Sequence, residues 1–274
     1  MNNNLMMTLA LALFLVTMAW AQDQKHRLSV DGDDFGEIEK INFYTKGIPL
    51  TVIGTQERFI TYELISEGKH TYEVSDLFSV SKKYNLLSFT EKAVEVKGIN
   101  LKVTMPEHLV LEFTNQSAQL TLKGLKTRYL EIASEDGMVG LVDIVSEGID
   151  ISCDSCTLNM ESIAATISSV NKHGNTMIDV ESLKLFNNFE HPIIASSDTG
   201  DITLNLPKEI TTTVKTRAKH IQVDDELSAG LKQEGKYTYV RIKGGKDYGK
   251  NSTHPTRNMV ILSSNQGEVR ILKR

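Results

Sequence analysis

The chain has 274 residues, of which 30 are Lys or Arg and 35 are Asp or Glu, and its net charge at neutral pH is −5. This mild acidic balance excludes the large basic field of a nucleic-acid-binding protein, so we expect no nucleic-acid partner. Its 18 glycines, five prolines and alternating aliphatic and polar residues predict a chain of short β-strands and tight turns.

The first 21 residues are typical of an export signal. They contain no charged side chain, carry an apolar run at residues 5–16 and end in Ala19-Trp20-Ala21, a small-x-small cleavage pattern. We expect a signal peptide that is cleaved after Ala21, and no later apolar run is long enough to span a bilayer. The alternative is an uncleaved membrane anchor, which the polar residues 22–24 disfavour. The protein is therefore expected in the periplasm, at the cell surface or outside the cell.

Residues 22–90 are expected to form N-terminal strands and a cap. Residues 38–53 show the order strand, turn, strand, and residues 59–65 alternate as a further strand. Residues 72–87 fit two patterns, because Val74, Leu77 and Phe78 approach helical spacing while residues 78–81 alternate as a strand. We predict a short helix here that caps one end of the molecule.

A repeat between residues 111 and 185 dominates the rest of the chain. Its first strand recurs at steps of 19, 19 and 18 residues, at Leu111, Leu130, Ile149 and Ile167. A polar tetrad follows each of these, at residues 115–118, 134–137, 153–156 and 171–174. A second apolar strand then opens at Leu120, Val139, Leu158 and Met177. A unit of this length cannot bury its apolar face alone and must stack on its neighbours. Residues 91–274 are therefore predicted to form an all-β, single-stranded β-solenoid, continuous with the N-terminal strands.

The pattern is interrupted at residues 186–192, which we interpret as a surface loop, and returns at residues 193–206. Further strands are expected at residues 211–216, 221–223 and 237–242. Residues 244–257 are charged and lack periodicity, which predicts an exposed loop. The chain closes with another strand, turn, strand unit at residues 260–272.

Several of these units share a form in which Ser-x-x-Gly precedes an acidic residue and an apolar strand, as at residues 197–206 and 264–272. With the opening unit at residues 41–54 and the export signal, they resemble the bacterial putative-adhesin family of β-strand repeats, a domain of unknown function that includes LiaG-like proteins. The Gly-Asp-Ile form typical of this family is intact once, at Gly200-Asp201-Ile202. The resemblance covers most of residues 38–272. It implies a right-handed β-solenoid in the bacterial envelope or outside the cell, and it supplies no catalytic residue.

Cys153 and Cys156 are the two cysteines, and the repeat places both on a turn tetrad. A turn brings its first and fourth residues within the distance that a disulfide needs, so we predict a structural disulfide between them in an exported protein. The alternatives are a redox pair, which needs a helix after the first cysteine, and a zinc site, which needs a second ligand pair. The sequence favours neither.

The tetrads also align polar side chains along one edge. Glu135, Asp136 and Asp154 fall on adjacent units, whose strands lie about 4.8 Å apart, so these carboxylates form a candidate ridge for a cation or a sugar. The alternative is a solvated row of turns. No cofactor and no metal-ligand spacing is predicted elsewhere.

The sequence leaves three functions open. The first is an exported, non-catalytic β-solenoid that binds a surface polysaccharide or an envelope or matrix protein, as the resemblance implies. The alternative is a polysaccharide lyase or hydrolase on the same scaffold. Asp143, Asp179 and Asp201 are its candidate carboxylates, but they have no repeated spacing that sets a catalytic separation. The third is an envelope scaffold with no dedicated ligand. We expect the first, and therefore no enzymatic activity.

Overall fold

The computed structural model describes residues 26–29, 38–66, 72–92, 96–183, 191–242 and 259–274. The expected signal peptide with its cleavage point at Ala21, most of the loop at residues 186–192, and the loop at residues 244–257 lie outside this part. Within the described residues, no helix is long and apolar enough to cross a membrane.

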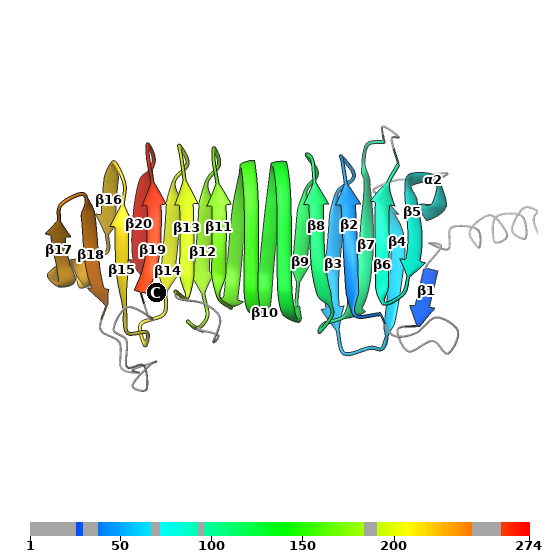
Figure 1. Cartoon of the computed structure of the whole chain (residues 1–274), viewed down its shortest axis with the longest axis horizontal. Helices are drawn as coiled ribbons and strands as arrows, with labels where there is room; N and C mark the ends of the chain where they lie inside the picture. Colours follow the sequence, from blue (N-terminus) through cyan, green and yellow to red (C-terminus); the bar gives the residue numbers. More distant parts are fainter. Residues whose placement is uncertain (1–25, 30–37, 67–71, 93–95, 184–190, 243–258) are drawn as a thin grey trace, which may run out of the picture.

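The described chain is nearly all β-strand, as the sequence predicts, and the strands run across the long axis of an elongated body (Figure 1). In the first half the strands are β1 (His26–Ser29), β2 (Lys40–Thr45), β3 (Leu50–Thr55), β4 (Phe59–Ser66), β5 (Phe78–Lys83), β6 (Leu86–Glu91), β7 (Ile99–Pro106), β8 (Val110–Asn115), β9 (Leu120–Lys123) and the long β10 (Lys126–Ala164). In the second half they are β11 (Ile167–Asn171), β12 (Thr176–Val180), β13 (Ile193–Ser197), β14 (Ile202–Leu206), β15 (Thr212–Arg217), β16 (His220–Val223), β17 (Leu231–Glu234), β18 (Tyr237–Ile242), β19 (Met259–Ser264) and β20 (Glu268–Lys273).

The predicted period of the repeat agrees with the pairing of the strands. Leu111 of β8 lies beside Leu130 of β10 in a parallel register, and Ile149 of β10 lies beside Ile167 of β11. These pairs are 19 and 18 residues apart, as the sequence pattern indicates. Residues at equivalent positions of neighbouring units therefore stack on one another.

One boundary of the repeat was predicted one residue too late. The second strand of the fourth unit opens at Thr176, which pairs with Leu158 and is buried, whereas Met177 points outward and is 39 % exposed. The cause is the shorter 18-residue step, which moves the inward position back by one. A threonine therefore occupies an inward position that the sequence pattern assigned to an aliphatic residue.

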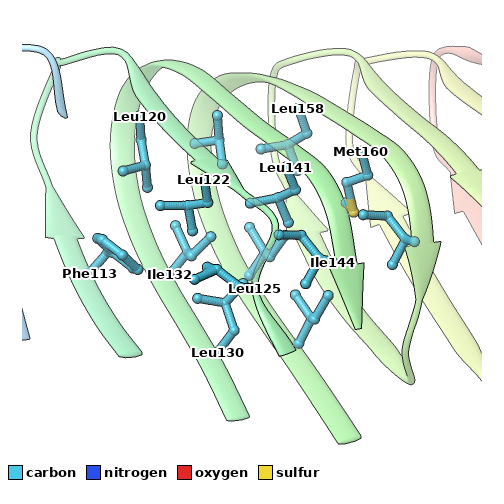
Figure 2. Packing of buried hydrophobic residues seen from close by; sticks show 14 of the residues in the cluster. Phe113, Leu120, Leu122, Leu125, Leu130, Ile132, Leu141, Ile144, Leu158 and Met160 are labelled. Carbon is cyan, nitrogen blue, oxygen red and sulfur yellow. The ribbon is translucent and has the colours of Figure 1, made fainter. Parts of the chain in front are cut away.

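Inward-facing residues of both strands of every unit fill the interior. Figure 2 shows the side chains of the central units pointing into the space between the two walls of strands. One hydrophobic cluster extends from Ile38 to Ile271, so the N-terminal strands and the repeat share a core. At one level Phe43 stacks between Phe89 and Phe113, with ring centroids 5.1 and 4.9 Å apart. Each buried aliphatic side chain contributes about 1.5–3 kcal/mol, so the stack depends on many such contacts acting together.

The first and last units of the chain do not lie at the ends of the body. β2 pairs with both β6 and β8, and β3 pairs with both β7 and β9. In the same way β19 lies between β13 and β15, and β20 lies between β14 and β16 (Figure 1). Each terminal unit is therefore held by parallel pairing on both sides.

The two ends of the body are closed by antiparallel strands. At the N-terminal end a helix is present, as predicted, but α2 (Val74–Leu77) has only four residues, and Val74 and Leu77 are buried. Most of residues 72–87 instead belongs to the β5–β6 hairpin, because the alternating pattern from Phe78 onward continues across the sheet. At the C-terminal end the β17–β18 hairpin and the 3-10 helix η1 (Asp225–Gly230) follow β15 and β16.

Candidate functional site

The first residue of each polar tetrad points into the molecule and has a structural role. Asn115 is buried and accepts a hydrogen bond from the Thr45 hydroxyl at 2.9 Å and another from the Ala118 amide at 3.1 Å. Its side-chain amide donates to the Ser134 hydroxyl at 2.9 Å and to the Ala118 carbonyl at 2.8 Å. At the equivalent position of a later unit, Ser264 donates to the Gly200 carbonyl at 2.8 Å. These residues hold the turns of neighbouring units together.

The two middle residues of each tetrad form the predicted ridge, and all of its carboxylates are exposed. Asp154 forms an ion pair with Lys172 of the next unit, and this contact raises the pKa of Lys172. Asp136 accepts a hydrogen bond from the amide of Gly137 at 2.6 Å. Among the described residues, no three His, Cys, Asp or Glu side chains are arranged to hold a metal ion. At Asp154, the ridge therefore contains an ion pair that joins two adjacent units.

Cys153 and Cys156 are both buried and are free thiols in this structure. They interact with each other: a hydrogen bond from Cys153 lowers the pKa of Cys156, whereas that hydrogen bond and burial raise the pKa of Cys153. The Cys156 thiol also lies 3.8 Å from the Ser134 carbonyl oxygen. The predicted disulfide therefore stays a prediction, to be checked by comparing the mass of the purified protein with and without reductant.

The carboxylates considered for an enzyme do not form a pair. Asp179 faces Asn205, which is four positions along β14 from Asp201. At about 3.3 Å per residue this separates the two by roughly 13 Å, more than the roughly 9.5 Å that inverting glycosidases span. Asp201 instead accepts a hydrogen bond from the amide of Glu268 at 2.8 Å, and Asp179 pairs with Arg274 at 2.9 Å. Asp143 is exposed and lies at a corner where its φ is 54°.

A row of outward-facing residues crosses five neighbouring strands near the C-terminal end. Its members are paired in sequence across β13, β19, β15, β18 and β17, and we call it the cross-strand row: Ile194, Ile261, Lys215, Tyr239 and Lys232. The Lys215 ammonium lies 4.3 Å from the centre of the Tyr237 ring and 6.0 Å from that of Tyr239. The row passes from aliphatic to aromatic and cationic side chains, so it offers apolar contact and positive charge on one surface.

A hollow of about 700 Å³ lies beside the cationic end of this row. It is lined by residues of η1, β17 and β18, together with Thr213 and Lys273. Two ion pairs lie at its wall, Lys232 with Glu234, and Lys273 with Glu226 at 3.7 Å. Arg241 also lines it and has no carboxylate partner among the described residues. The hollow can therefore accept an anionic group.

Sequence reasoning did not identify this surface. Two short patterns in the sequence point to it. Lys215 and Arg217 are alternate residues of one predicted strand, and Tyr237, Tyr239 and Arg241 are alternate residues of another, so each set lies on one face of its strand. From the sequence alone, these segments are predicted only as strands. Their pairing across β15 and β18 brings the two runs together.

No model of a protein family matches the chain, and no curated protein matches it. Solved structures with some likeness are a putative adhesin from Bacteroides fragilis NCTC 9343 and a putative cell adhesion protein from Clostridium sporogenes ATCC 15579, each 14% identical to this chain. Their TM-scores are 0.44 and 0.40, over 93% and 92% of this chain and 98% and 100% of theirs. A putative lipid binding protein from Parabacteroides distasonis ATCC 8503 is 9% identical, with a TM-score of 0.40 over 93% of this chain and 98% of its own. At these values the likenesses carry no conclusion about the ligand or activity of this chain.

Proposed function

We propose that the protein is an exported, non-catalytic β-solenoid that binds a polysaccharide or a protein of the cell envelope or matrix through its outer surface. The in-register parallel pairing of successive units supports a single-stranded solenoid as the scaffold, and the family resemblance implies that it is right-handed. The uncharged segment at residues 1–21, with its apolar run at residues 5–16 and the small-x-small pattern at residues 19–21, supports export.

One observation carries the proposal, namely that the inward positions are used for packing. The interior is filled by one hydrophobic cluster, and the buried polar residues of the tetrads bond to one another or to the backbone. A ligand must therefore be bound by outward-facing side chains. The outer surface offers two long walls of strands, and the hollow beside η1 adds a concave site.

The test is a binding array of glycans and matrix proteins, probed with the purified chain in calcium and in chelator, beside a polysaccharide-degradation assay. We expect saturable binding to at least one polymer without release of product. Release of oligosaccharide would show that the protein is an enzyme. The absence of any binding would leave a scaffold role and would refute the proposal.

Asp154→Asn separates the ridge from the rest of the surface in the same array. Because Asp154 is paired with Lys172, we expect binding by this variant to equal that of the unmodified chain. Calcium-dependent binding that Asp154→Asn abolishes would show instead that the ridge is the site.

A further inference from the structure

We infer that the C-terminal end of the sheet, from the cross-strand row to the hollow, binds an acidic polysaccharide whose sugars carry carboxylates. This inference rests on the proposed binding function and names the ligand class. It is argued from local charge, from the placement of the tyrosines and from the shape of the surface.

The three strands at this end carry an excess of basic residues, although the adjoining η1 contains Asp225 and Glu226, the second of which is paired with Lys273. Lys215, Arg217, Lys232, Lys236 and Arg241 lie on three adjacent strands or the turn between two of them, whereas the chain as a whole has a net charge of −5. On β17 and its turn, Glu234 is the one acidic residue, and it is paired with Lys232. Among the described residues, neither arginine has a carboxylate partner. Both guanidinium groups can therefore bind a carboxylate of a ligand in two parallel hydrogen bonds.

The tyrosines are placed to contact sugar rings beside these cations. Tyr237 and Tyr239 are alternate residues of β18, so both project from the same face, and each is only partly buried. Lys215 and Lys236 hold their ammonium groups 4.3 and 5.4 Å from the centre of the Tyr237 ring. The apolar face of a sugar packs on an aromatic ring, while its carboxylate would lie against the neighbouring ammonium or guanidinium group.

The surface is long enough for several sugars. Five strands at a spacing of about 4.8 Å place the members of the row along roughly 19 Å. The end of the row that lies farthest from the hollow is aliphatic: it consists of Ile194, whose side chain is 40 % exposed, and of Ile261, its partner on the next strand. A polymer that crosses the strands therefore meets apolar contacts first and then the aromatic and cationic residues beside the hollow.

Single-stranded nucleic acid is the competing ligand class, because aromatic and basic residues also bind stacked bases and phosphates. The net charge of −5 disfavours it, because proteins that bind nucleic acid carry a large basic field.

The experiment measures binding of the purified full chain to three probes: an oligogalacturonate, the same oligosaccharide with its carboxylates methyl-esterified, and a single-stranded oligothymidylate. We expect saturable binding of the oligogalacturonate, at least tenfold weaker binding of the ester, and no saturable binding of the oligothymidylate. The affinity for the oligogalacturonate should fall as the salt concentration rises.

The variant Arg217→Gln/Arg241→Gln removes both unpaired guanidinium groups, and both residues are exposed. We expect about tenfold weaker oligogalacturonate binding per arginine, or about 100-fold together. The matched control is Arg128→Gln, because Arg128 is an exposed arginine of β10 paired at 3.7 Å with Glu147, away from this surface. It should leave binding unchanged.

Equal binding by the double variant would overturn the assignment of this surface, as would a preference for the oligothymidylate. Equal binding of the acid and its ester would overturn the acidic ligand class while leaving the proposed binding function in place. If the array of glycans and matrix proteins also shows no binding to any polymer, the proposed binding function itself fails. A failure of the ligand class is thus distinguished from a failure of the binding function.

Discussion

Substituting Gly200 tests how tightly successive units are stacked. A Cβ atom at Gly200 would lie 1.9 Å from the carbonyl oxygen of Gly174 and 2.5 Å from its carbonyl carbon. An ordinary contact begins near 3.4 Å, so the methyl group is too close by about 1.5 Å. Both opposing atoms belong to the backbone and cannot rotate away. The two units must therefore separate at this turn.

Separation breaks identifiable hydrogen bonds. The amides of Asp198 and Thr199 each donate to the Lys172 carbonyl at 3.0 Å, and the Asp201 amide donates to the side-chain oxygen of Asn175 at 3.0 Å. At about 1 kcal/mol for each bond lost, with some overpacking strain remaining, Gly200→Ala should lower the free energy of unfolding by about 3 kcal/mol.

The control is Gly47→Ala, because Gly47 lies on the corresponding turn of the first unit and a Cβ there meets nothing within 4 Å. It should change the free energy of unfolding by no more than about 0.5 kcal/mol. Urea denaturation followed by far-UV circular dichroism measures both variants. Equal midpoints and slopes for Gly200→Ala and Gly47→Ala would refute the close stacking of the turns.

Four further changes test other parts of the structure. Asn115→Ala should cost about 3 kcal/mol in urea denaturation, because two buried backbone groups lose their partner; a loss below 1 kcal/mol would contradict this. Glu91→Gln should cost about 2 kcal/mol in the same assay, since this buried carboxylate accepts hydrogen bonds from three turn amides, and an unchanged midpoint would oppose that role. Deletion of residues 259–274 should speed hydrogen exchange on both sides of the missing unit, whereas normal protection there would show that the unit is dispensable. Burial raises the pKa of Asp179 above its usual 3.8, although Arg274 opposes the shift, so the folded state holds this proton to higher pH and stability falls as pH rises through the folded pKa. Asp179→Asn should reduce that fall in denaturation series at several pH values, and an equal or steeper fall would contradict the assignment.

The period of the repeat could be predicted because it depends on local information. Leu111, Leu130 and Ile149 recur at a fixed step, and each must be buried, so the alternation of apolar residues sets the register of the neighbouring strands. The shift at Met177 could not be predicted in this way. A buried threonine and an exposed methionine reverse the usual preference, and the pairing of the units decided the register.

The order of the units was not predictable from the same pattern. Residues 38–55 and 259–273 show the repeat form, but nothing local states that each is inserted between two other units. This order depends on contacts between segments that are distant in the sequence. The adjacency of the ridge residues followed from the repeat, and Lys172 stood beside Asp154 in the same alignment, so their ion pair could have been foreseen.

The inserted C-terminal unit also builds the proposed binding surface. Ile261 of β19 lies between Ile194 and Lys215, so the cross-strand row is continuous only while this unit is in place. A polymer that spans the row contacts three segments that are separated in the sequence. Because the row is broken when β19 is detached, such a polymer binds the folded arrangement more tightly than one with β19 detached. By linkage, such a ligand at 100 times its dissociation constant would stabilise the inserted unit by about 2.7 kcal/mol. Binding at this surface and the stability of the C-terminal unit are therefore coupled, and slower hydrogen exchange in β19 on addition of oligogalacturonate would report both.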